Sequence, residues 1–199
     1  TLQGFIDGTT QTNHTVYANT IQSRNVSVQG SLWGGNLSVL SSLAGTPYMP
    51  DINGGILFIE DVNEQPYQIE RALQNLHLAG VLKKQQAIVL GDFRMGRIQD
   101  AYDPNYNLSS VAALMQRVTG VPVLTGFPFG HIRNKATFPL GAQASIRPQA
   151  NGGYSVSFSD YPTLNPNQLS LSNLLPPPAI IPEDLNAEPV NDTTATDAG

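Results

Sequence analysis

Short apolar runs alternate with helix-like stretches through the middle of the chain, and this alternation constrains the fold more than any other feature. The runs cover residues 55–59, 87–90 and 121–124. Continuous apolar strands are typical of parallel sheets that are covered on both faces. Residues 66–80 and 108–120 instead place apolar side chains at i, i+3, i+4 and i+7, as amphipathic helices do. The pattern predicts an α/β domain with a sheet or partial barrel and two main helices.

The predicted helices have recognisable start and stop signals. Pro66 suits the first turn of one main helix and Gly80 its end, and Gly120 ends the other. Asn36 is a predicted N-cap for a short additional helix that Gly45 ends. The apolar residues of the three helices are Leu37, Leu40, Leu43 and Ala44, then Ile69, Ala72, Leu73 and Leu76, then Val111, Leu114, Met115 and Val118.

A β-hairpin is predicted near the end of the domain. Apolar and polar residues alternate through 142–146 and again through 154–158, and the Asn-Gly-Gly sequence at 151–153 supplies a turn between them. Residues 126–131, which precede the hairpin, contain too much glycine and proline for regular structure and are predicted to be a loop.

Composition divides the chain into three segments. Residues 1–30 have few apolar side chains and are predicted to be a strand or two within an interdomain connection, or the end of a missing N-terminal domain. Residues 31–175 form the predicted α/β domain. Residues 176–199 are predicted to be a disordered, acidic, proline-rich tail, because they bury too little apolar surface to offset the entropy of ordering. This tail holds five of the fifteen acidic residues and no Lys or Arg, so it accounts for the net charge of -5.

The composition argues against several classes of site. The absence of cysteine excludes disulfides, zinc-thiolate sites, iron–sulfur clusters and a cysteine nucleophile. The neutral domain carries no basic footprint for nucleic acid, and nucleotide-binding glycine motifs are absent. No apolar run approaches the roughly 20 residues that cross a bilayer, and the first residues show no signal-peptide pattern. We therefore expect no cofactor, nucleic acid or membrane as a partner.

Two acidic residues directly follow the first apolar run. Glu60 and Asp61 come after residues 55–59, at a position where a strand end holds a carboxylate rigidly in a crevice. The alternative is that both acids flank the helix that begins near Pro66, whose N-terminal dipole favours negative charge. The pattern alone leaves both interpretations open.

A single histidine lies in the loop after the third apolar run. His131 is suited to act as a general base near neutral pH, and the alternative is a structural or simply exposed side chain. His14 and His77 carry weaker signals and are assigned to solvent or local packing. A metal site would require Glu60, Asp61, Asp92 and His131 to converge as ligands, but the chain has none of the common histidine or calcium-loop motifs.

Several sequence blocks resemble the C-terminal domain of the LD-carboxypeptidases in their order and spacing. They include Gly-Gly-Asn-Leu at 34–37, Ile-Glu-Asp-Val at 59–62, Leu-Gly-Asp-Phe at 90–93 and Pro-x-Gly-His at 128–131. The likeness extends from about residue 31 to residue 146, and the microcin-immunity peptidases share the same plan. The resemblance implies a swivelling β/β/α-type C-terminal domain.

The resemblance also implies an activity. Members of this family are serine peptidases with a Ser-Glu-His triad, and the matching positions here are Glu60 and His131. Their substrate is a murein tetrapeptide, from which they remove the terminal D-alanine during cytoplasmic recycling of peptidoglycan. The family further implies a serine-bearing N-terminal domain as partner, and a homodimer.

The sequence departs from the family in lacking a nucleophile. No strand-to-helix turn of the Gly-x-Ser-Asp kind occurs in it, so we expect the chain to be the C-terminal part of a longer enzyme, inactive alone. Two alternatives remain: a non-catalytic peptide-binding or assembly module that keeps both residues as relics, and a microcin-immunity-type amide hydrolase. Trp33, beside two glycines, is either a pocket aromatic or a packing anchor.

Overall fold

The computed structural model describes residues 2–20, 25–97, 103–165 and 167. Thr1–Leu164 forms one compact unit, and Asn165–Gly199 forms a second. The predicted domain boundary at residue 175 lies outside the described residues. The tail predicted at 176–199 lies outside the described residues.

The described residues of the first unit contain a seven-stranded sheet. The strands are β1 (His14–Ala18), β2 (Val28–Asn36), β3 (Ile56–Glu60), β4 (Ala87–Leu90), β5 (Val123–Leu124), β6 (Gln143–Pro148) and β7 (Tyr154–Ser159), in the order β1-β7-β6-β2-β3-β4-β5. Strands β2 to β5 pair in parallel, and β1, β7, β6 and the first part of β2 pair antiparallel. This mixed sheet confirms the predicted α/β class.

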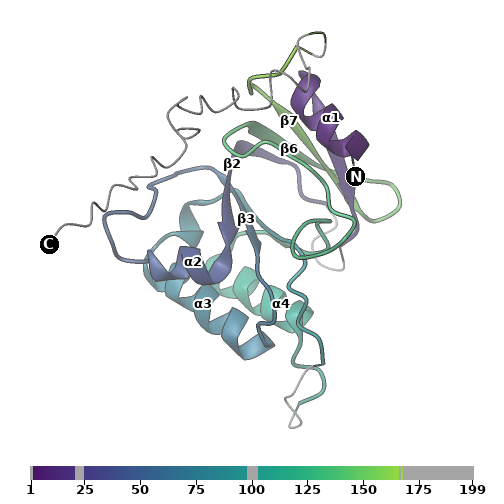
Figure 1. The fold of residues 1–199 in the computed structure, drawn as a ribbon. Coiled ribbons are helices and arrows are strands. Elements are labelled where there is room, and N and C mark those ends of the chain that lie inside the picture. Colours follow the sequence, from purple (N-terminus) through teal and green to yellow (C-terminus); the bar gives the residue numbers. More distant parts are fainter. Residues whose placement is uncertain (1, 21–24, 98–102, 166, 168–199) are drawn as a thin grey trace, which may run out of the picture. The chain divides into compact units, whose positions relative to one another are not determined.

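One face of the parallel half of the sheet is covered by three helices. They are α2 (Leu37–Ser42), α3 (Pro66–Leu78) and α4 (Leu108–Thr119), which lie together beside β3 (Figure 1). Leu57 and Ile59 of β3 point into this helical layer. Every residue of β3 is buried, as the uninterrupted apolar run predicted.

A second core lies on the opposite face of the sheet. Because successive side chains of a strand alternate between faces, Ile56 and Phe58 of β3 point into this core. The predicted hairpin is confirmed as β6 and β7, and it contributes its apolar side chains Ala144, Ile146, Tyr154, Val156 and Phe158. Glu60 continues the alternation of Ile56 and Phe58, so it lies on this face of the sheet.

The predicted starts of the helices and the end of α4 are confirmed, but α2 ends at Ser42, so Leu43 and Ala44 lie beyond it. The side chain of Asn36 accepts a hydrogen bond from Val39 N at 3.1 Å and caps α2, and Gly120 ends α4 in the left-handed conformation. Val118, predicted on the apolar face of α4, is 36% exposed, and Ala112 is buried instead. A short 3₁₀ turn, η1 (Leu82–Lys84), connects α3 to β4.

The N-terminal segment differs in part from the prediction of strands in an extended connection. It begins with an unpredicted helix, α1 (Leu2–Thr10), and its described residues also contain β1 and the first residues of β2, in line with the predicted strand or two. The hydroxyl groups of Thr9 and Thr10 bond to main-chain oxygens within the helix, and Leu164 N donates to Thr9 O. These local and long-range contacts outweigh the weak helix propensity of Gly4 and Gly8.

Strand β2 was not predicted along its full length, because glycine disfavours strands. Gly34 lies opposite Phe58, and a Cβ atom there would approach the Phe58 carbonyl oxygen to 1.9 Å. The glycine therefore permits the close approach of β2 and β3 that places Asn36 beside Glu60.

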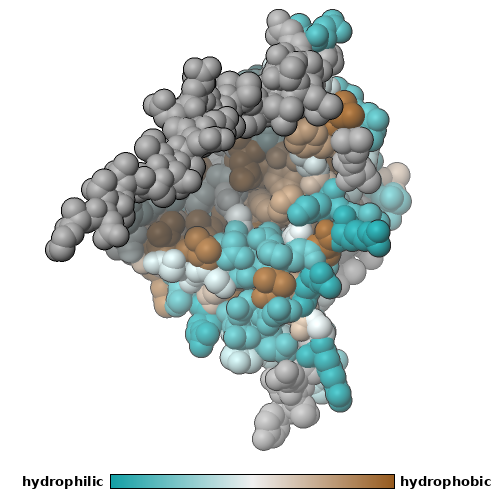
Figure 2. Space-filling view, in the orientation of Figure 1, coloured by the Kyte–Doolittle hydropathy of each residue, from teal (hydrophilic) through white to brown (hydrophobic). Residues whose placement is uncertain are grey.

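The face seen in Figure 2 is mainly hydrophilic in its lower part, with isolated hydrophobic residues. Val39 of α2 and Leu78 of α3 are among the exposed large hydrophobic side chains. Among the described helices, none has the length and apolar character needed to cross a membrane.

Candidate active site

The site begins at the carboxyl end of β3. Glu60 is the last residue of this strand and is only 7% exposed. The neighbouring strands β2 and β4 fix the strand end on both sides. A carboxylate attached to such a framework has little freedom to move, so its position is set by the sheet.

His131 reaches the same place from the loop that follows β5. Phe127 and Phe129 of this loop pack edge-on against Phe58, with ring centroids 5.6 and 5.3 Å apart. Phe58 precedes Glu60 by two residues on the same face of β3. The aromatic contacts therefore bring His131 to Glu60 across a sequence separation of 71 residues.

The two side chains are in direct contact. Nδ1 of His131 lies 3.0 Å from Oε2 of Glu60. An ionised carboxylate only accepts hydrogen bonds, so Nδ1 carries the proton of this bond. The Glu60 side chain is 9% exposed and that of His131 is 53% exposed. The described residues offer Nε2 no hydrogen-bond partner, and about half of the side chain that carries it is exposed.

Gly91 makes this arrangement possible. A Cβ atom at this position would lie 2.5 Å from the Phe129 carbonyl oxygen and 3.3 Å from Glu60 Cβ. Only glycine therefore allows the loop after β5 that carries His131, here called the histidine loop, to pack so closely over the end of β4.

Asp61 faces away from Glu60 and holds the N-terminus of α2. Its carboxylate accepts hydrogen bonds from Ser38 N at 2.9 Å, Ser38 Oγ at 2.6 Å and Asn36 Nδ2 at 2.9 Å. Burial by itself would raise the pKa of Asp61, but the hydrogen bonds from Ser38, Val62 and Asn36 outweigh it and lower the pKa below its usual value. Adjacent acids thus have different structural settings.

The lowered pKa of Asp61 gives an expected pH dependence of stability. Its contribution is complete above the ordinary Asp pKa of about 3.9 and is lost as the pH falls through the lower folded-state value. At neutral pH, Asp61→Asn should reduce the free energy of unfolding by about 1–3 kcal/mol, because an amide NH₂ would face hydrogen-bond donors. Urea unfolding at several pH values should show this difference shrinking below about pH 4. The exposed Asp160→Asn is the matched control, and an equal effect there would contradict the interpretation.

The other sequence-predicted residues lie elsewhere or have structural roles. Asp92 is exposed and accepts a hydrogen bond from Arg94 N at 2.8 Å. Trp33 is buried and its Nε1 donates to Gln85 Oε1 at 2.8 Å, so it is a packing anchor. His14 contacts the Thr137 carbonyl oxygen at 2.9 Å. The described residues contain no group of three or more His, Asp or Glu that could hold a metal ion.

Neither acid caps the helix that begins at Pro66. The N-cap of α3 is Gln65, whose main-chain N–H donates to the Gln68 side chain at 2.8 Å. Asp61 instead serves the N-terminus of α2, a partner that the sequence separation concealed. The sequence analysis also missed Ser38, which donates hydrogen bonds to Asp61, and Arg94, which donates one to the main-chain oxygen of His131. Both contacts exist only because the fold brings distant segments together.

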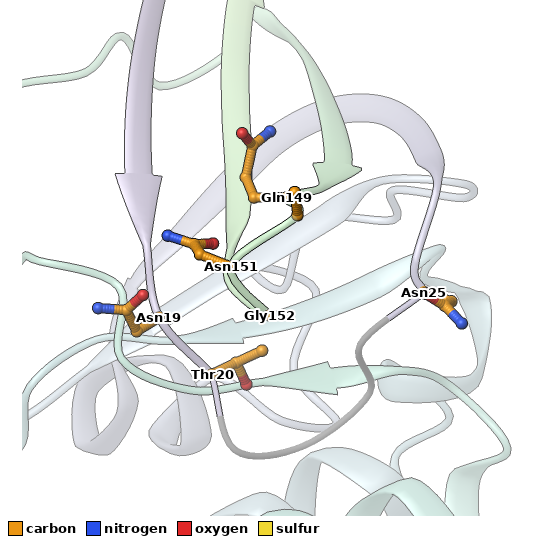
Figure 3. A pocket seen from close by; sticks show the side chains of 7 residues that line it. Asn19, Thr20, Asn25, Gln149, Asn151 and Gly152 are labelled. Carbon is orange, nitrogen blue, oxygen red and sulfur yellow. The ribbon is translucent and has the colours of Figure 1, made fainter.

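Several hollows lie on the described part of the unit, including the following two. One of about 450 Å³ borders the site and is lined by Gly91, Asp92, Phe93, Arg94, Met95, Gly96, Leu108, Gly126, Phe127, Pro128 and Ile132. The other, about 650 Å³, lies between the end of β1, the β6–β7 turn and Asn25 (Figure 3). Its described lining offers Asn, Gln and Thr side chains but no acid or base, so the reactive pair lies outside it.

Comparison with known sequences decides the family. A family model for the LD-carboxypeptidase C-terminal domain matches residues 29–146, which is more than half of the chain. The chain belongs to the LD-carboxypeptidase family. This confirms the resemblance recognised in the sequence, and the matched region contains both Glu60 and His131.

Relatives of known sequence or structure agree with this membership. The chain is 38% identical over 118 residues to the probable murein peptide carboxypeptidase of Bacillus subtilis, covering 59% of this chain and 37% of that protein. It is 36% identical over 122 residues to the microcin C7 self-immunity protein MccF of Escherichia coli, covering 60% and 34%. The chain therefore spans little more than a third of the length of these LD-carboxypeptidase relatives.

A solved structure shows the same fold. The muramoyltetrapeptide carboxypeptidase of Oxalobacter formigenes is 42% identical in sequence and superposes with a TM-score of 0.75. The structural alignment covers 82% of this chain and 55% of that one. The strands and helices within residues 29–146 are therefore those of an LD-carboxypeptidase C-terminal domain.

Proposed function

We propose that this chain supplies the glutamate and histidine of a Ser-Glu-His triad in a serine-type LD-carboxypeptidase. The observation that carries the proposal is the 3.0 Å contact between Glu60 and His131, with the imidazole half exposed. The substrate would be a murein tetrapeptide, and the product released would be its terminal D-alanine, in cytoplasmic recycling of peptidoglycan. The nucleophilic serine would come from an N-terminal domain that covers the exposed face of His131.

The geometry suits base catalysis by His131. Nε2 would accept the proton of the serine hydroxyl as its oxygen attacks the peptide carbonyl carbon. Glu60, bonded to Nδ1, would stabilise the imidazolium that forms and keep the ring in the correct tautomer. Nε2 would then return the proton to the leaving amine nitrogen of D-alanine. A water molecule, activated by the same histidine, would hydrolyse the acyl-serine ester.

A chimeric enzyme tests this function. Residues 29–146 would replace the matching segment of the Bacillus subtilis relative, and D-alanine release from an L,D-tetrapeptide would be measured. We expect turnover by the chimera, because the segment brings both triad residues, and no turnover by the 199-residue chain alone. Circular dichroism would establish that each protein is folded. Turnover by the chain alone, or a folded but inactive chimera, would contradict the proposal.

The likeness to MccF favours one alternative substrate. The chain is 36% identical to MccF and 38% identical to the carboxypeptidase relative, so neither likeness outweighs the other. The scissile bond in the alternative function is the amide of a peptide-nucleotide. Assaying the same chimera with both substrates separates the two functions. A folded chimera that cleaves neither substrate would support the non-catalytic binding module.

A further inference from the structure

The side chain of Arg94 reaches the histidine loop from the segment after β4. Its Nη1 donates a hydrogen bond to the main-chain oxygen of His131 at 2.8 Å, across 37 residues of sequence. This contact is a charge-assisted bond, which is stronger than one between neutral groups. It therefore connects the end of one parallel strand to the residue that carries the exposed imidazole.

The backbone of Arg94 is held in an unusual conformation that aims this side chain. Its φ is 41°, in the left-handed region that costs a residue with a side chain about 1 kcal/mol. Asp92 stabilises the turn, because its Oδ1 accepts a hydrogen bond from Arg94 N at 2.8 Å. A strained backbone that is held by a neighbouring side chain indicates that the position of the Arg94 side chain matters.

The same segment holds the histidine loop at a second point. Asp92 N donates to Phe129 O at 2.7 Å, and Asp92 forms a parallel bridge with Gly130. The carbonyl groups of Phe129 and His131, on either side of Gly130, are thus both held by residues 92–94. Gly130 has a φ of 140°, which only glycine adopts readily, so glycine is required between these two held carbonyl groups.

The imidazole depends on this support because its other restraints are few. The His131 side chain is 53% exposed, and its hydrogen bond to Glu60 joins it to a rigid strand end. A shift of the His131 main chain would lengthen that bond directly. The position of the ring is therefore set by where the loop lies, and Arg94 fixes the carbonyl of His131 itself.

We propose that Arg94 is a positioning residue for His131: its guanidinium holds the His131 carbonyl and so keeps imidazole Nδ1 against Glu60. The consequence for catalysis rests on the proposed function, but the positioning is a property of this chain alone. Arg94 acts through His131 and does not itself take part in proton transfer.

Imidazole ¹⁵N NMR on the 199-residue chain tests the positioning. At alkaline pH His131 should be the Nδ1–H tautomer, because Nδ1 faces a carboxylate, and His14 provides an internal reference with Nε2 facing a carbonyl. In Arg94→Met we expect the ¹⁵N shifts of His131 to move to those of a free imidazole, which is mainly Nε2–H. Arg94→Lys should restore the Nδ1–H form in large part, because lysine retains a cationic donor.

The variants are matched so that the result is decisive. Met and Lys at position 94 both have to adopt the same left-handed backbone conformation, so the two variants differ only in the side chain. Arg133→Met removes an equal charge from an exposed position of the histidine loop. We expect Arg133→Met to leave the His131 spectrum unchanged. A wild-type His131 spectrum in Arg94→Met, with the His14 and His77 signals also unchanged, would overturn the proposal.

Kinetics of the chimera separate this proposal from the proposed function. There, Arg94→Met should lower kcat about tenfold with KM little changed, and Arg94→Lys should recover most of the loss. If the chimera is inactive but the NMR result holds, the positioning stands and the triad function fails. If the chimera is active and Arg94→Met has no effect on kcat or on the imidazole spectrum, the positioning fails and the triad function stands.

Discussion

Replacing His131 by alanine in the chimeric enzyme should lower kcat/KM by about 10⁴-fold or more, the loss seen when a triad loses its base. Without the imidazole, no base among the described residues contacts Glu60 and could take the proton of the serine hydroxyl. Glu60→Gln should cost somewhat less, about 10³–10⁴-fold, because the amide no longer stabilises the imidazolium. The double variant should be no slower than His131→Ala alone, since both residues act as one unit.

Steady-state release of D-alanine provides the measurement. His77→Gln is the control, because α3 belongs to the helical layer on the opposite face of the sheet from Glu60. It should leave kcat/KM unchanged within about twofold, a change of less than 0.5 kcal/mol in the barrier. A loss of less than about tenfold in His131→Ala would show that this histidine is not the general base.

Removing the ring of Phe58 should have the largest effect on stability. Phe58 is 2% exposed, and its ring packs edge-on against those of Phe127, Phe129 and Phe138 at 5.6, 5.3 and 5.1 Å. Phe58→Ala should lower the free energy of unfolding by about 3–5 kcal/mol, because it removes buried surface and leaves a cavity. The same cavity frees the histidine loop, so the contact between His131 and Glu60 should also be lost.

Urea unfolding of the chain measures this loss. The free energy of unfolding of an ordinary domain is about 5–15 kcal/mol, so the loss in Phe58→Ala is large enough to unfold a marginal one. Phe58→Leu is therefore added as a milder variant that stays folded. The control is Phe5→Ala, since Phe5 is 54% exposed on α1 and should contribute less than about 0.5 kcal/mol. Similar losses at both positions would contradict a special role for the aromatic cluster.

The sequence predicted those parts of the fold that depend on periodicity. The apolar run ending at Glu60 identified a buried parallel strand, and the spacing of Ile69, Leu73 and Leu76 identified α3. The end of that strand also marked Glu60 as a candidate, because a strand end holds a carboxylate rigidly. These features follow from local pattern, which one sequence contains.

The remaining features depend on contacts between distant segments. Arg94 has no local signal, because its partner is the carbonyl of a loop residue 37 positions away. The glycine-rich β2 was missed along part of its length because local propensity disfavours the strand that β3 and β6 enforce. The separate roles of Glu60 and Asp61 became distinguishable only when the direction of each side chain was known.

The pairing of β1 with β7 also affects the order in which the protein can be assembled on the ribosome. Thr15 and Ser157 contact each other across 142 residues, and β1 forms one edge of the sheet. At about 5–20 residues per second, translation delivers β7 on the order of ten seconds after β1. During this interval the main-chain N–H and C=O groups of β1 that pair with β7 have no partner strand. Such long-range pairing slows folding, so nascent chains would be vulnerable to aggregation until the hairpin emerges.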